Sequence, residues 1–135
     1  SPSDATLIQA HKGLDAACRF LEPGGELLFV AELAGGSGSP AMEPFLDDPR
    51  PEPILERLSR DWVQYGHTTL RLVTLTARHR VHLVSSLDDT VAHRLGFLPV
   101  RDPSAVVDGW RRTRGGDTVA VIPGQAVYPR PAPAG

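Results

Sequence analysis

At residues 23–31 the chain reads PGGELLFVA, a glycine turn followed by an unbroken apolar run of strand length. A run without polar alternation is typical of a strand that is covered on both faces, as the strands of parallel sheets are. Pro23, Gly24 and Gly25 end the preceding segment, because these residues interrupt helices. We therefore expect residues 26–31 to form a central strand.

On either side of this strand the pattern alternates between helix and strand. Upstream, residues 6–21 carry apolar side chains at helical spacing, with Asp4 or Thr6 available as the N-terminal cap. Downstream, the pattern predicts helices at 41–47, 52–63, 67–79, 88–95 and 104–112 and strands at 81–84, 97–100 and 118–122. This alternation predicts an α/β fold with three layers, namely a mostly parallel sheet of four or five strands with helices on both faces.

Length and composition predict a single domain. The 135 residues suffice for one core, which we assign to residues 1–128. The Pro-rich tail 129–135 has no capacity to form a packed core, and we expect it to be disordered.

Charge and hydrophobicity exclude several classes of partner. The net charge is -2 and the arginines are dispersed, so we expect no nucleic-acid partner. No segment approaches the ~20 consecutive apolar residues of a membrane span, so we expect no membrane partner. A single cysteine, Cys18, and a first segment unlike a signal peptide predict a cytoplasmic protein.

The first predicted helix carries the strongest candidate site. Gln9 and Lys12 are three residues apart and lie opposite the apolar stripe, with the small residues Gly13 and Ala16 beside them. A lysine next to an amide can hold a carboxylate, since one supplies charge and the other a directional donor. The nearby helix N-terminus would add to the stabilisation of an anion. The same pair is also what any solvated helix face carries, so its spacing alone does not identify a site.

Residues 7–17 (LIQAHKGLDAA), 23–25 (PGG), 31–32 (AE) and 35–38 (GGSG) together resemble the opening of the C-terminal domain of the lactate racemase family. The weaker stretches 78–85, 95–99 and 118–123 follow the order of that family's helices and strands. The resemblance implies that the glutamine and lysine of the Q-x-x-K pattern, here Gln9 and Lys12, orient a 2-hydroxy acid substrate.

The resemblance also implies a two-domain racemase of which this chain is one half. In such enzymes a nickel-pincer nucleotide (nickel held by a pyridinium bisthiocarboxylate mononucleotide) and the histidine bases belong to the N-terminal domain. We therefore expect no metal, cofactor or catalytic residue in this chain, no racemase activity from it alone, and the N-terminal cofactor-bearing domain and a small 2-hydroxy acid as its partners.

Two ring side chains are candidates for contact with that cofactor. The segment Tyr65-Gly66-His67 resembles the place where the family presents a ring toward the pyridinium, which points to His67. Trp62 lies just upstream and is an alternative, although a tryptophan there would equally be buried for packing. A surface histidine at a helix start is the plainer interpretation of His67.

Other patterns favour plainer interpretations or different functions. His79 and His82 have no carboxylate or cysteine at ligand spacing, so we expect no metal site. The loop at 35–39 lacks the lysine of a P-loop, which makes a nucleotide-binding module the weakest hypothesis. The main alternative to the racemase domain is a stand-alone α/β ligand-binding or protein-interaction domain without catalysis.

Overall fold

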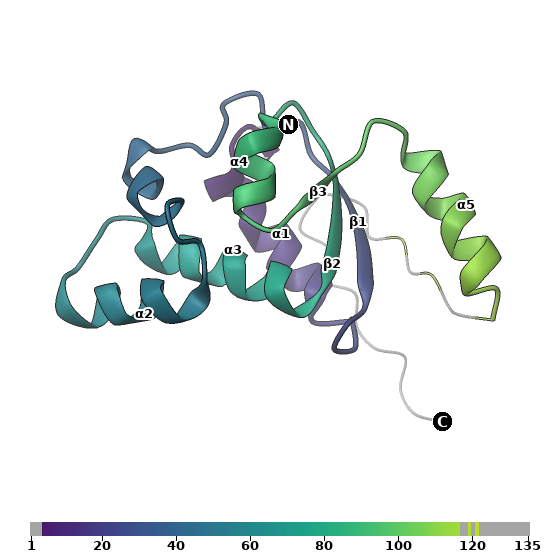
Figure 1. Cartoon of the computed structure of the whole chain (residues 1–135). Coiled ribbons are helices and arrows are strands. Elements are labelled where there is room, and N and C mark those ends of the chain that lie inside the picture. Colours follow the sequence, from purple (N-terminus) through teal and green to yellow (C-terminus); the bar gives the residue numbers. More distant parts are fainter. Residues whose placement is uncertain (1–3, 117–118, 120, 122–135) are drawn as a thin grey trace.

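The computed structural model describes residues 4–116, 119 and 121 and contains a parallel sheet (Figure 1). Its strands are β1 (Glu26–Val30), β2 (Arg80–Val84) and β3 (Leu98–Pro99), in the order β1-β2-β3. Leu27 lies opposite Val81 in the register, and His82 lies opposite Leu98. The stretch that follows Gly25 therefore forms a strand as predicted, and its neighbours arrive from residues more than fifty positions along the chain.

Helices precede and connect the strands, and most begin at a residue that caps them. The Thr6 hydroxyl accepts a hydrogen bond from Gln9 N, and the Asp88 carboxylate accepts from Thr90 N. Asp102 caps the last helix in the same way. The helices are α1 (Leu7–Cys18), the 3₁₀ helix η2 (Pro40–Phe45), α2 (Pro51–Arg60), α3 (Gly66–Arg78), α4 (Asp89–Arg94) and α5 (Pro103–Thr113).

The two faces of the sheet are covered differently. Val81 and Leu83 are fully buried on the face that α1, α3 and α4 cover, and they belong to the main core. Alternate residues of the strands, including Glu26 and His82, point to the opposite face, where α5 lies (Figure 1). No residue of α5 is fully buried, so the second cover is thinner than the first.

The predicted α/β class is confirmed, but the predicted number of strands is wrong. Within the described residues the sheet has three strands, whereas the sequence predicted four or five. The strand predicted at 97–100 spans only two residues, because Arg101 and Asp102 already lead into α5. The strand predicted at 118–122 and the tail 129–135 fall largely or wholly outside the described residues.

The segment between β1 and α3 departs from the predicted pair of α-helices. Where the sequence predicted a helix at 41–47, the structure has the 3₁₀ helix η2. Pro44 lacks the amide hydrogen that an α-helix needs at that position. α2 ends at Arg60, three residues before the predicted boundary. Among the helices that the structure describes, none has the length and apolar character that a bilayer crossing demands.

Candidate substrate-anchoring site

The exposed face of α1 presents Lys12 to solvent. Leu7, Ala10, Leu14 and Cys18 form the buried stripe of this helix, whereas Gln9, Lys12 and Gly13 are exposed on the other side. Lys12 is the only lysine of the chain, whose other permanent cations are arginines. A lysine is a compact point charge that can follow a small anion, whereas the planar arginine fork imposes its own geometry.

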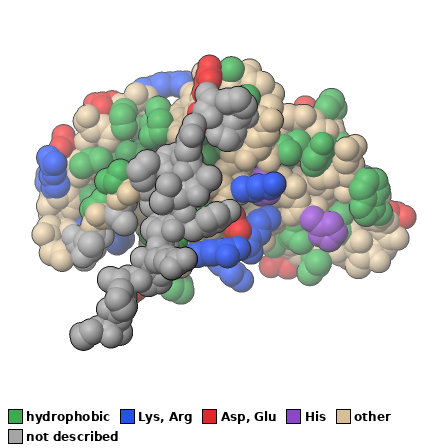
Figure 2. Space-filling view, turned by 180° about the vertical axis from the view of Figure 1, so that it is seen from behind, with side chains coloured by type: hydrophobic (Ala, Val, Ile, Leu, Met, Phe, Trp, Pro, Cys, Tyr) green, Lys and Arg blue, Asp and Glu red, His purple; other side chains and the backbone are tan. Residues whose placement is uncertain are grey.

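Lys12 lines a depression between α1 and α3. Its volume is about 330 Å³, at the lower end of the range for small-molecule sites. Lysine and arginine side chains gather near the middle of the face seen from behind (Figure 2). The residues that line the depression are His11, Lys12, Asp15, Ala16, Arg19 and Arg71.

A salt-bridge cluster holds the wall of this depression. Asp15 Oδ1 accepts a hydrogen bond from Arg71 Nε at 2.7 Å and forms an ion pair with Arg71 Nη2. Asp15 Oδ2 accepts from Arg19 Nη2 at 3.2 Å. One carboxylate therefore faces two guanidinium groups and the Lys12 ammonium, so the net charge of the depression is positive and favours an anion.

Gln9 stands beside the depression rather than in it. Its side-chain oxygen accepts a hydrogen bond from the Thr6 hydroxyl at 3.3 Å. Among the described residues the amide NH₂ group of Gln9 has no hydrogen-bond partner, so it can donate to a ligand near the first turn of α1. The structure thus puts Gln9 and Lys12 on one exposed helix face, with only Lys12 in the depression.

His67 and Trp62 are both accessible. His67 is exposed in the first turn of α3, one turn before Arg71 and on the same side of that helix. Trp62 follows the end of α2 and is 80% exposed, so the expectation that packing would bury it is wrong. The turn between them contains Tyr65 in the left-handed region, with a φ of 59°.

The glycine-rich loop at 35–39 supports the N-terminus of α1 through backbone hydrogen bonds. The backbone amides of Leu7 and Ile8 donate to the carbonyl oxygens of Gly36 and Ser37, so part of the N-terminus of α1 is already satisfied. The loop amides of Gly35 and Gly36 donate to other backbone carbonyls. This arrangement counts against a phosphate cradle, and it also removes the helix N-terminus that was expected to assist an anion at Gln9.

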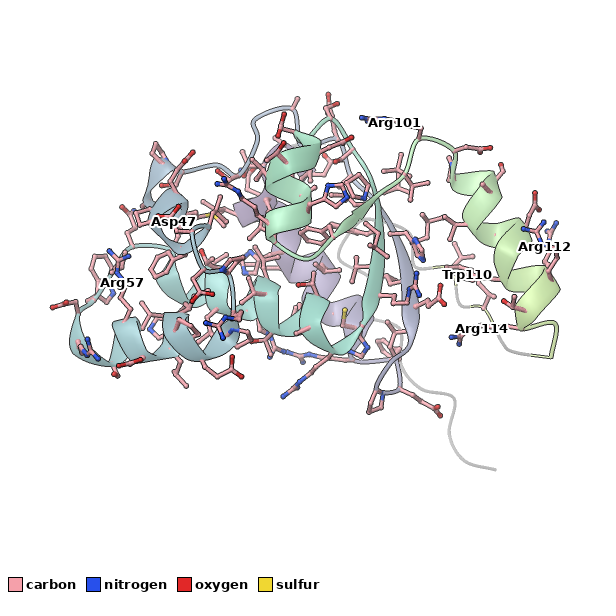
Figure 3. The ribbon with its side chains drawn as sticks, viewed as in Figure 1. Asp47, Arg57, Arg101, Trp110, Arg112 and Arg114 are labelled. Carbon is pink, nitrogen blue, oxygen red and sulfur yellow. The ribbon has the colours of Figure 1, made fainter. Side chains whose placement is uncertain are left out.

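A polar cluster on the other face of the sheet was not predicted from the sequence. Glu26 accepts hydrogen bonds from Trp110 Nε1 at 2.6 Å and from His82 Nε2 at 3.0 Å, and Arg114 Nη2 lies 3.4 Å from its other oxygen. Trp110 and Arg114 project from α5 toward β1 (Figure 3). The only sequence feature that pointed to this cluster was Glu26 itself, a charged residue at the start of an otherwise apolar strand.

This cluster perturbs the carboxyl group of Glu26. Burial by itself raises the pKa of Glu26, but the hydrogen bonds from Trp110 and His82 and the charge of Arg114 outweigh it and leave the pKa below its usual value. The His82 and Trp110 rings also meet edge to face, with centroids 6.2 Å apart. The cluster therefore serves to dock α5 on the sheet.

Comparisons with known proteins concern the fold. No family model matches the chain, and no curated protein sequence matches it. A solved structure with a similar fold is that of the lactate racemase apoprotein from Thermoanaerobacterium thermosaccharolyticum, with a TM-score of 0.70 and 18% sequence identity. The match covers 85% of this chain and 29% of that chain. The chain thus has the fold of a lactate racemase-like domain and spans less than a third of the protein it resembles.

Proposed function

We propose that this chain is the substrate-orienting C-terminal domain of a nickel-pincer-dependent 2-hydroxyacid racemase. The observation that carries the proposal is the position of Lys12 in a positively charged depression between α1 and α3. A small hydroxy acid is an anion, and an ammonium group in such a depression attracts its carboxylate. The fold likeness to part of a lactate racemase is the second support.

In this proposal Lys12 and Gln9 share the task of orienting the substrate. The Lys12 ammonium takes the carboxylate, and the NH₂ group of Gln9, whose oxygen is engaged by Thr6, donates to a substrate oxygen. Two donors of different geometry restrict the rotation of a small ligand, and correct orientation alone supplies much of a catalytic rate enhancement. The chain therefore contributes positioning, and the bond-breaking groups belong elsewhere.

The proposal assigns the nickel-pincer nucleotide to a separate N-terminal domain. Across residues 4–116, 119 and 121 no three histidine, cysteine, aspartate or glutamate side chains are grouped so that they could hold a metal ion. His67 and Trp62, both exposed, are proposed to face the flat ring of that cofactor, because aromatic rings stack on one another.

A binding experiment on this chain tests the proposal. Reductive methylation with ¹³C-formaldehyde labels the side chain of Lys12, the only lysine, and retains its charge. Titration with L-lactate at constant ionic strength is expected to shift this signal and the backbone amides of Gln9 and Lys12, with saturation at millimolar concentration. Propionate, which lacks the 2-hydroxyl group, is expected to bind more weakly.

Matched variants and an activity assay complete the test. Lys12→Gln removes the labelled side chain, so it is followed through the backbone amide of Gln9, whose lactate-dependent shift is expected to disappear. Arg78→Gln, the same charge change outside the depression, is expected to leave the shifts intact. The unmodified chain alone is expected not to racemise enantiopure L-lactate. Shifts from lactate no larger than those from chloride would contradict the proposal and favour a stand-alone interaction domain, and racemisation by the chain alone would also overturn it.

A further inference from the structure

The depression beside Lys12 carries more positive charge than a substrate with one carboxylate needs. Lys12, Arg19 and Arg71 line it together with a single acidic side chain, Asp15. One carboxylate bound at Lys12 would leave the cluster of Asp15, Arg19 and Arg71 with a surplus positive charge. Uncompensated like charges in one site repel one another, so a second negative group on the ligand would be stabilised there.

Arg71 is held in place to receive that second group. Its Nε donates to Asp15 Oδ1 and its Nη2 forms an ion pair with the same oxygen, which holds the guanidinium group in place. The other donors of the fork have no hydrogen-bond partner within the described part of the chain. Its side chain is 45% exposed, so these donors are accessible to a ligand. A fixed guanidinium with open donors is suited to a planar carboxylate.

The buried Cys18, near Asp15 and Arg71, adds no negative charge to the depression. Cys18 is buried in the α1 stripe, and burial, with the Asp15 charge as the next cause and Arg71 opposing it, raises the pKa of its thiol to about 11. The thiol is therefore neutral at physiological pH. Asp15 remains the single carboxylate among the lining side chains.

We propose that the substrate is a small 2-hydroxy acid with a second carboxylate, which Lys12 and Arg71 bind at its two ends. This inference rests on the proposed function and specifies its substrate class. Asp15 acts as a positioning residue that aligns Arg71 from the facing helix. Arg19 donates to the other oxygen of Asp15, so the three side chains together carry one surplus positive charge.

The test compares two ligands on the full chain. L-Lactate has one carboxylate, and L-malate is a 2-hydroxy acid with two. Their dissociation constants are measured at constant ionic strength from the ¹³C signal of methylated Lys12. L-Malate is expected to bind at least about tenfold more tightly, since a hydrogen bond between charged groups supports a ratio of that size. Arg71→Gln is expected to weaken malate binding much more than lactate binding and so to remove this preference, whereas Arg78→Gln is expected to retain it.

Each outcome separates the two proposals. If lactate shifts the Lys12 signal but malate binds no more tightly, the dicarboxylate inference is overturned and the proposed function stands. If lactate shifts it no more than chloride does, the proposed function itself fails. A preference that survives Arg71→Gln would also overturn the inference. Should that variant fail to fold, Arg71→Lys decides, because it retains the charge but loses the fork, and its preference is expected to fall severalfold.

Discussion

Replacing Gly66 with alanine should destabilise the protein, although alanine is the better helix former. Gly66 is the first residue of α3, and its backbone is in a conformation that alanine also adopts. A Cβ atom there would lie 3.2 Å from Cζ of Phe45 and closer still to Cδ2 of Leu58, nearer than real Cβ contacts come. Either the Leu58 and Phe45 side chains would have to change conformation or α3 would have to move away from α2 and η2, and overpacking of this kind costs about 1–3 kcal/mol.

Gly13 is the matched control, because it is the same residue in a helix with open space around it. A Cβ atom at Gly13 would meet no atom within 4 Å. Gly13→Ala should therefore stabilise the protein by about 0.5–1 kcal/mol through the ordinary helix preference for alanine. Both substitutions restrict the unfolded chain equally, so the difference between them isolates the steric cost at Gly66.

Thermal and urea unfolding, followed by far-ultraviolet circular dichroism, measure both changes. At about 4 °C per kcal/mol, Gly66→Ala should lower the melting temperature by several degrees and Gly13→Ala should raise it slightly. A Gly66→Ala protein as stable as Gly13→Ala would refute the close approach of α3 to α2. It would also undermine the placement of His67, which is the next residue along the helix.

Two further predictions concern α5 and the cap of α1. Because the pKa of Glu26 is lowered in the folded state, its stabilising contribution should be complete above its ordinary value of 4.5 and be lost as the pH falls through the folded value. The stability difference between the wild type and Glu26→Gln, from urea unfolding at pH 3 to 7, should therefore shrink toward acid, and a constant difference would contradict this. Thr6→Val should cost about 1 kcal/mol because it removes the hydroxyl that caps α1, and Thr6→Ser should restore most of it in the same assay.

Local sequence patterns predicted most of the helices and strands. α1 and β1 follow from apolar spacing and from the glycine turn between them, and Thr6 was one of two predicted caps. These elements depend on interactions between residues a few positions apart, which a pattern records directly. The strand at 97–100 was shorter than predicted, because the chain turns away toward α5 after Val100, and a local pattern does not show where that turn begins.

The candidate site was predictable only in part. Helical spacing placed Gln9 and Lys12 on one exposed face, and the structure confirms that arrangement. Arg71 is 56 positions away from Asp15, and only the packing of α3 against α1 brings its guanidinium to that carboxylate. The exposure of Trp62 likewise depends on the point at which α2 ends.

The sequence alone determined the helices, the central strand and the exposed position of Lys12, because periodicity and turn residues act within a few positions of the chain. The tertiary structure decided which charges stand together. Ion pairs such as that of Arg71 with Asp15, and hydrogen bonds such as that of Trp110 with Glu26, 84 positions apart, form only after the helices have packed on the sheet. Their partners are too far apart in the sequence for a pattern of residues a few positions apart to record them.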